Sequence, residues 1–234
     1  MPDYRDAIKK VLEHEGGFVN NPLDKGGATN WGVTQTTYNQ YMSAKLGKPY
    51  SSTVDEIKKM PMDIAIDIYK KLYWDKIQGD KIRKYTVALA IFDQAINRGV
   101  SSAVKQAQKV VKKLDPMGFA KITEDGVMGP ATLAALNSIA EKPFIDNYLS
   151  ESKLFYQNIV QRNPSQSVFL TGWLNRITSL SNELTKKIGS INSTTVGIGI
   201  GVVVMVGLGS YLLWKYGMPS FNINSPGMSK QRTA

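Results

Sequence analysis

The sequence predicts a mainly α-helical protein that ends in one membrane-spanning helix. Apolar residues recur at steps of three and four along most of the first 187 residues, as amphipathic helices require. A polar, glycine-rich stretch at 20–30 interrupts this pattern and is expected to be a loop in which a small β-hairpin can form. Residues 188–214 carry no charge, and the run is long enough to cross a bilayer as a helix.

The first helix is predicted from a stripe at Tyr4, Ala7, Ile8, Val11 and Leu12, and the Gly16-Gly17 pair is expected to end it. Glu15 continues the same stripe at the helix end. A carboxyl group on the core-facing side of a helix is expected to have a raised pKa, which suits a general acid.

More helices follow the glycine-rich loop. A Thr53–Glu56 capping box opens one of them, and Gly99 separates two others. The stretch 115–129 is expected to be a turn-rich linker before Pro130 begins another helix. The predicted helices cover 34–46, 53–60, 62–73, 86–98, 101–114, 130–140, 144–162 and 165–187.

Composition excludes several classes of function. The chain has no cysteine and one histidine, so a thiolate metal site, a disulfide framework and a histidine-rich metal site are not available. The net charge of +10 suits an anionic partner, either nucleic acid or bacterial cell wall. Lysine pairs are scattered over predicted helix surfaces without a recognised nucleic-acid motif, which favours the wall and predicts no specific nucleic acid partner. A basic membrane protein that contacts DNA in a salt-sensitive way is a competing hypothesis.

The stretch 13–33 carries the clearest chemistry. Glu15 stands before two glycines, and Asp24 and Thr29 follow within fourteen residues, beside a second glycine pair. One acid that protonates a leaving oxygen and a second polar group that handles water or developing positive charge suit cleavage of a glycosidic bond. Alternatively, Glu15 is a solvated helix-end residue and the glycines are ordinary loop residues. The presence of Asp24 and Thr29 nearby in the sequence favours the catalytic interpretation of Glu15.

This stretch resembles the signature of glycoside hydrolase family 108, the bacterial and phage N-acetylmuramidases. The matching residues are Glu15, Gly16, Gly17, Asp24, Gly26, Gly27, Thr29, Gly32, Val33 and Thr34. Segments 73–75 and 91–99 are similar to the middle of that family. Segments 125–130 and 163–176 are similar to its C-terminal peptidoglycan-binding part.

The resemblance implies a lysozyme-like helical fold with Glu15 as the catalytic acid, and Asp24 and Thr29 as its partners. It also implies a catalytic region at 1–90 and a helical peptidoglycan-binding region at 91–187, which either stand apart or share one core. The implied reaction is hydrolysis of the β-1,4 bond between N-acetylmuramic acid and N-acetylglucosamine in peptidoglycan strands, with no cofactor or metal.

Two further pairs are candidates for substrate binding. Tyr73 and Trp74 could stack on sugar rings, although their spacing also fits a helix core. Asp93 and Asn97 stand four residues apart on one face of a predicted helix, where they form either a polar wall of the substrate groove or a surface stripe.

The predicted span covers 194–214, and the tail 215–234 is expected to be flexible. Glycines in the span would permit close helix pairing, so a homo-oligomer or a complex with virion membrane proteins is expected; a peripheral hairpin is the alternative. We therefore expect a single-pass, C-terminally anchored enzyme in a virion membrane or host inner membrane. It would act in wall penetration or host lysis by a phage. The competing hypothesis is a non-catalytic peptidoglycan-binding structural membrane protein of a virion.

Overall fold

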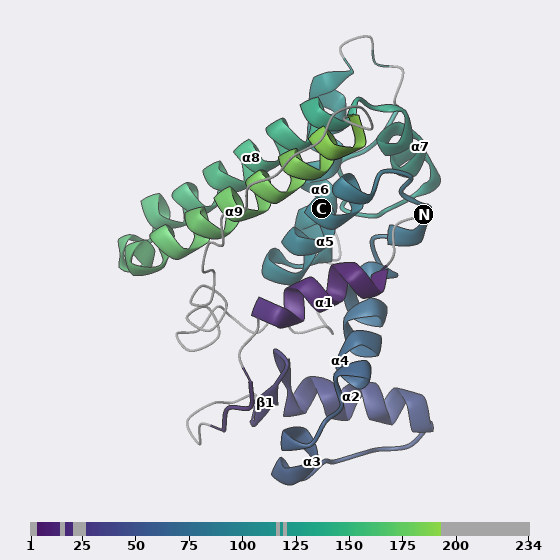
Figure 1. Ribbon diagram of the computed structural model, residues 1–234, viewed down its shortest axis with the longest axis vertical. Coiled ribbons are helices and arrows are strands. Elements are labelled where there is room, and N and C mark those ends of the chain that lie inside the picture. The colour runs from purple at the N-terminus through teal and green to yellow at the C-terminus, as the bar shows by residue number, and fades with distance from the viewer. Residues whose placement is uncertain (1–3, 15–16, 21–26, 116–117, 119–120, 193–234) are drawn as a thin grey trace, which may run out of the picture.

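The computed structural model describes residues 4–14, 17–20, 27–115, 118 and 121–192. These form a mainly helical protein with one two-stranded antiparallel sheet (Figure 1). The long helices gather in one half of the molecule. The hairpin and two shorter helices lie at the other end, below α1 in the view of Figure 1.

The predicted fold class is corrected at one point. Among the described helices, none is long and apolar enough to cross a membrane, so the transmembrane helix and the single-pass membrane localisation are not supported. The longest described helix, α9 (Ser167–Asn192), carries charges along its length and packs against α8 (Glu141–Arg162). The prediction inferred a helix from an uncharged composition alone. The segments to which it applied, 194–214 and 215–234, lie outside the described residues.

The first helix, α1 (Tyr4–His14), has the stripe that its sequence predicts. Ala7, Ile8, Val11 and Leu12 are buried, and they pack the helix against α4 (Met62–Tyr69) and the π-helical turn η1 (Lys70–Trp74). Helix α1 ends at His14, directly before Glu15.

The glycine-rich stretch leads into a hairpin of two very short strands, β1 (Thr29–Asn30) and β2 (Val33–Thr34). Both turn residues, Trp31 and Gly32, have positive φ values, of 53° and 69°, as a two-residue hairpin turn of type I′ requires.

Helix α2 (Gln35–Leu46) starts directly after the hairpin. Thr34 caps it by accepting a hydrogen bond from the amide of Thr37, and Gly47 ends it in the left-handed conformation. Helix α3 (Val54–Lys58) begins with the predicted capping box, in which Thr53 and Glu56 bond reciprocally.

Helix α5 (Tyr85–Arg98) runs through the centre of the molecule. Eleven of its fourteen residues are buried, so it is covered on every side, which only an interior helix can be. The short 3₁₀ turn η2 (Gly79–Lys81) precedes it, and Gly99 (φ +84°) turns the chain into α6 (Val100–Leu114).

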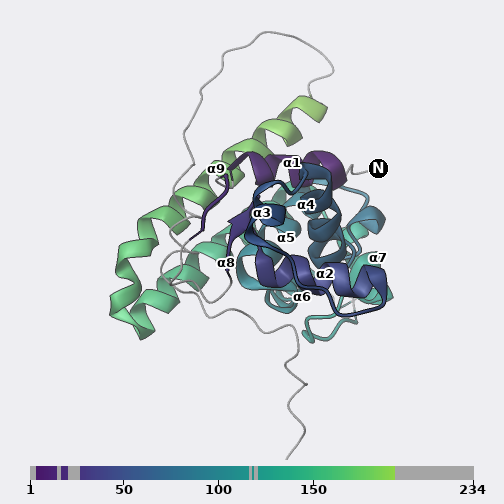
Figure 2. The ribbon, with the colours of Figure 1, turned by 90° about the horizontal axis from the view of Figure 1, so that it is seen from below.

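The last part of the fold contains α7 (Pro130–Ser138), α8, the 3₁₀ turn η3 (Pro164–Gln166) and α9. Helices α8 and α9 run side by side as a long hairpin that reaches beyond the other helices (Figures 1 and 2). Tyr156 of α8 stacks on Trp173 of α9 with ring centroids 5.0 Å apart, and both rings are buried.

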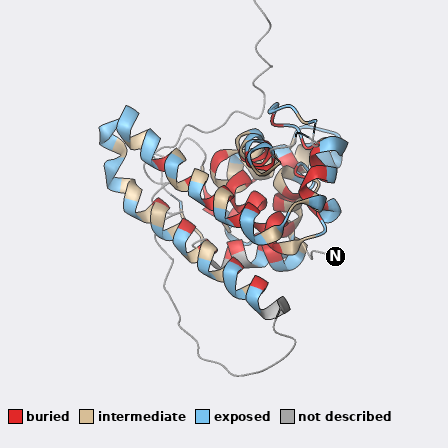
Figure 3. Ribbon diagram, turned by 90° about the horizontal axis from the view of Figure 1, so that it is seen from above, coloured by how far each residue is buried: buried red, intermediate tan, exposed pale blue. Residues whose placement is uncertain are grey.

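Buried side chains from α1 to α9 belong to one continuous hydrophobic core. In Figure 3 the buried positions of the long hairpin lie on its inward side, and the outer side is exposed. The core therefore joins α1 and the β1–β2 hairpin to the C-terminal helices.

Candidate active site

Thr29 is the one predicted catalytic residue within the described ranges; Glu15 and Asp24 lie outside them. Its backbone pairs with Val19, since each amide donates to the other's carbonyl oxygen at 2.8 Å. The side chain is only 6% exposed, and its hydroxyl has no hydrogen-bond partner among the described residues. A buried hydroxyl without a partner is costly unless a ligand, a water or another side chain completes it.

Two residues beside Thr29 dock the hairpin onto α3. The Asn30 side-chain amide donates to the carbonyl oxygens of Ile57 at 3.0 Å and Lys58 at 3.1 Å, at the C-terminal end of α3. The Trp31 indole donates to the carbonyl oxygen of Met60 at 3.0 Å. These contacts hold Trp31 in a left-handed backbone conformation that large residues rarely adopt. The conformation of the turn is therefore stabilised by tertiary contacts and not by its own residues alone.

The sequence interpretation missed this role of Asn30 and Trp31. The available signal was the two-residue spacing between β1 and β2, which is typical of a tight hairpin. The carbonyl groups that these side chains satisfy are 27 to 29 residues away in the sequence, so no local pattern reveals them.

Gly27, at the end of the second glycine pair, lies where a side chain would not fit. Its φ is +75°, and a Cβ atom there would approach Gln35 Oε1 to 2.8 Å. Gln35 in turn donates from its side chain to the carbonyl oxygen of Ser52 at 2.6 Å and from its backbone to that of Ala28 at 2.7 Å. The glycine therefore lets Gln35 tie the start of β1 to the segment before α3.

Trp74 lies in the core. It is fully buried, packs edge-on against Phe92 at 5.3 Å, and donates from its indole to Asp80 Oδ1 at 2.8 Å. A Cβ atom on Gly79 would come within 2.3 Å of its ring, so that face is covered by backbone. Tyr73 is half-buried beside Tyr69, with ring centroids 5.7 Å apart, and remains a candidate for substrate contact.

Asp93 and Asn97 lie together on α5, and the side-chain amide of Asn97 donates to the backbone carbonyl oxygen of Asp93 at 2.6 Å. The Asp93 carboxylate is buried. It accepts hydrogen bonds from Arg176 of α9 and from Gln94, so it joins α5 to α9. Asn97 is half-buried and remains a candidate for substrate binding.

Comparisons with known proteins agree with this architecture. A family model described as glycosyl hydrolase 108 matches residues 8–99, and one described as a predicted peptidoglycan domain matches 102–178. The structure of SagA from Brucella abortus is similar with a TM-score of 0.59 and 32% sequence identity; the match covers 78% of this chain and 94% of that one. The chain belongs to the glycosyl hydrolase 108 family. Comparison with curated proteins finds no match.

As a member of this family, the chain pairs a glycoside hydrolase segment with a peptidoglycan-binding segment, and peptidoglycan is its partner. The first segment contains positions 15, 24 and 29, and the second contains the α6–α9 helices up to residue 178. Within the described ranges, no three acidic or histidine side chains gather as ligands for a metal.

In this glycosyl hydrolase 108 family member, hydrogen bonds from a buried glutamine attach the loop 123–129 to α6. Gln108, which is 1% exposed, donates to Asp125 Oδ1 at 2.8 Å and to the carbonyl oxygen of Val127 at 3.0 Å, and accepts from the amide of Gly126 at 2.9 Å. Hydrogen bonds from the Val127 amide and Gln108 hold the pKa of the Asp125 carboxyl below its usual range. The Gln78 side chain donates to the carbonyl oxygen of Met128, which joins this loop to the hydrolase segment.

Proposed function

We propose that this protein is an N-acetylmuramidase that hydrolyses the β-1,4 bond between N-acetylmuramic acid and N-acetylglucosamine. The observation that carries the proposal is the buried hydroxyl of Thr29, which has no hydrogen-bond partner in the described ranges and lies on a docked hairpin inside the segment that matches glycosyl hydrolase 108. A folded protein tolerates such a group where it serves a site, because packing alone would favour an apolar side chain.

Glu15 is the proposed general acid. The buried positions of α1 repeat at steps of three and four up to Leu12, and position 15 continues that series directly after the helix ends. Val19, whose backbone pairs with that of Thr29, stands four positions after Glu15 in the sequence. In the sequence, the proposed acid thus stands shortly before the bridge that fixes the backbone of Thr29.

In the proposed reaction the Glu15 carboxylic acid protonates the glycosidic oxygen as the bond to the anomeric carbon breaks. Asp24 orients the attacking water or stabilises the positive charge that develops on the sugar. The Thr29 hydroxyl assists through a hydrogen bond to the water or to a carboxylate. All three groups come from the polypeptide, and the reaction needs only water as a second substrate.

The test is cleavage of purified peptidoglycan by the wild type and by Glu15→Gln, with new reducing ends identified by mass. We expect N-acetylmuramic acid at the new reducing ends, and a rate for Glu15→Gln lower by about 10²–10⁴, the usual contribution of a general acid. Glu13→Gln, two residues earlier, is the matched control and should cleave at the wild-type rate. Equal rates for Glu15→Gln and wild type would place the acid elsewhere.

A non-catalytic wall-binding protein is the second candidate, favoured by the match of 102–178 to a peptidoglycan domain. It predicts that the wild type binds peptidoglycan without generating reducing ends. The phage role in wall penetration or lysis stays a prediction from the sequence.

A further inference from the structure

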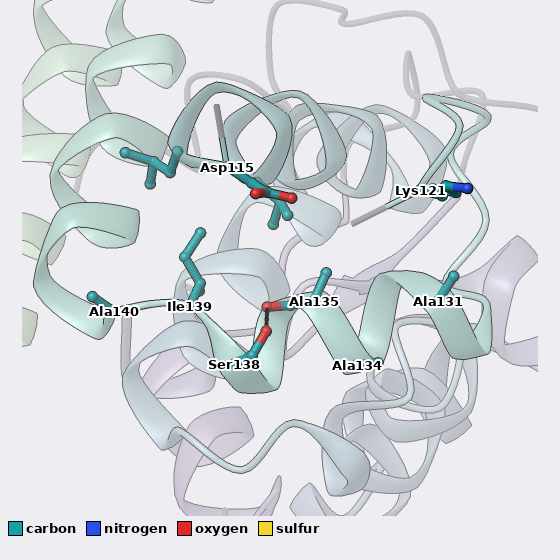
Figure 4. Close-up of a pocket in the computed structure, with 10 residues that line it drawn as sticks. Asp115, Lys121, Ala131, Ala134, Ala135, Ser138, Ile139 and Ala140 are labelled. Carbon is teal, nitrogen blue, oxygen red and sulfur yellow. Dashed lines mark hydrogen bonds between the residues drawn. The ribbon is translucent and has the colours of Figure 1, made fainter. Parts of the chain in front are cut away.

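The second segment contains an open groove between α6 and α7, with a volume of about 810 Å³ (Figure 4). This lies within the range of roughly 300–1,000 Å³ that is typical of small-ligand sites. Its described lining belongs wholly to the segment matched as a peptidoglycan domain. The lining residues are Val111, Leu114, Asp115, Lys121, Ala131, Ala134, Ala135, Ser138, Ile139 and Ala140.

Helix α7 presents an unusual face to this groove. Its nine residues, P-A-T-L-A-A-L-N-S, include no charged side chain, whereas about two would be expected at the 21% charged composition of the chain. Ala131, Ala134 and Ser138 are exposed and share one side of the helix. Exposed alanines without intervening charges leave a shallow apolar floor that a ligand can approach closely.

The groove also has one charge of each sign. Asp115, at the end of α6, lies across from Ala135, and Lys121 lies towards Ala131 (Figure 4). The Ser138 hydroxyl donates to the carbonyl oxygen of Ala135 at 3.0 Å, which leaves its oxygen free to accept from a ligand.

The chemistry of the described lining suits a peptide. The described lining has no aromatic ring on which a pyranose could stack. A short peptide with small side chains, a carboxylate and an amine would instead place its methyl groups on the alanine floor and its charges near Lys121 and Asp115. In peptidoglycan, the stem peptides have this composition, since they contain alanines, an acidic residue and a diamino acid.

We infer that the α6–α7 groove binds the stem peptide of peptidoglycan. This inference rests on the proposed function, which identifies peptidoglycan as the polymer. It assigns the peptide of that polymer, and not its glycan strand, to the α6–α7 groove. The first segment would act on the glycan strand while this groove holds the peptide that branches from it.

The groove is also held at a fixed position relative to the hydrolase segment. Asn137 of α7 accepts from the Arg83 amide at 2.7 Å and donates to the carbonyl oxygen of Lys81 at 2.9 Å. The Lys84 ammonium donates to the carbonyl oxygen of Ile139, at the groove's edge. Peptide binding would therefore select where along the wall the hydrolase segment acts.

The test is calorimetric titration of the full chain with a synthetic stem tetrapeptide and, separately, with a chito-oligosaccharide. Ala134→Gln lengthens a side chain on the groove floor without adding charge or disfavouring the helix. Ala44→Gln, at an exposed alanine of α2, is the matched control. We expect Ala134→Gln to weaken tetrapeptide binding by about tenfold or more and Ala44→Gln to leave it unchanged. Lys121→Ala should weaken it and reduce its dependence on salt.

Each outcome bears on the inference. Unchanged tetrapeptide binding by Ala134→Gln, or no tetrapeptide binding by a folded wild type, would overturn it. A loss of oligosaccharide binding in Ala134→Gln would also overturn it, in favour of a sugar subsite. Self-association of the wild type that Ala134→Gln abolishes, without tetrapeptide binding, would assign the groove to a second copy of this chain. Cleavage of peptide-free glycan strands, measured in parallel with Glu15→Gln, tests the proposed function independently, because those strands lack the groove's ligand.

Discussion

Arg176 of α9 holds the carboxylate of Asp93 of α5 through two hydrogen bonds to the same oxygen, at 2.8 Å from Nη2 and 3.1 Å from Nε. Both side chains are largely buried, with 14% and 9% of their surfaces exposed. The two residues are 83 positions apart, and they belong to the hydrolase and peptidoglycan segments respectively. One ion pair therefore ties the two family segments together inside the shared core.

Asp93→Asn should destabilise the protein by about 3–5 kcal/mol, because it removes the buried carboxylate charge that pairs with the Arg176 guanidinium. The free energy of unfolding in denaturant measures this. Asp146→Asn, which breaks the exposed pair with Lys142 (2.6 Å), is the control and should leave the unfolding midpoint in place. The double change Asp93→Leu with Arg176→Met should recover much of the loss; failure of Asp93→Asn to destabilise would mean that the pair contributes little.

Thr29→Val should separate stability from activity. The substitution keeps the side-chain shape and removes a hydroxyl that has no described partner, so the stability should stay the same or rise by about 1 kcal/mol. The rate of peptidoglycan cleavage should fall at least about tenfold if the hydroxyl serves the reaction. Thr171→Val, at an exposed position of α9, should alter neither quantity. An active Thr29→Val variant would remove Thr29 from the site.

Gly126→Ala should destabilise the loop that Gln108 holds. Gly126 has φ +78°, and a Cβ atom there would meet Ser101 Oγ at 2.3 Å and the Ser101 carbonyl oxygen at 2.8 Å. We expect a loss of roughly 1–3 kcal/mol from strain and displaced backbone, seen as a lower melting temperature. Gly129→Ala is the matched control, since a Cβ atom there meets nothing within 4 Å and its φ is −86°. Equal melting temperatures for the two variants would contradict this account.

The stability of the α8–α9 hairpin should fall at alkaline pH. Burial raises the pKa of Tyr156 from 10.0 to about 12, against the opposing influence of the Arg98 charge. Folding thus favours the neutral phenol, and its contribution is complete below pH 10 and lost as the pH rises from 10 towards about 12. Tyr156→Phe keeps the ring on Trp173 and should flatten the decline in unfolding free energy over this range. A decline as steep as that of the wild type would assign it to other groups, including the buried Tyr148, whose pKa burial also raises.

Much of the fold could be predicted from local patterns. The stripe of α1, the capping box of α3, the break at Gly99 and the proline start of α7 each depend on residues within a few positions of one another. The apolar run 194–214 shows the limit of such patterns. Composition alone predicted a membrane helix there, and among the described residues the structure supports none.

The assignments of individual polar and aromatic residues depended on distant partners. In the sequence, Trp74 and Asp93 are of residue types expected to line a substrate groove. In the structure, Trp74 is enclosed by Phe92 and Gly79, and Asp93 is paired with Arg176. The contacts that Asn30 makes with Ile57 and Lys58 are equally invisible in sequence.

The sequence by itself determined the helical class, the glycine-rich stretch with its candidate acid, and the family resemblance, because periodicity and motif spacing are local properties of the chain. Only the tertiary structure decided which polar side chains are paired inside the core, that α1 and α5–α9 share one core, and that α6 and α7 line an open groove. Those features arise where segments far apart in sequence meet, and the free energy of burial and of pairing is decided at such contacts.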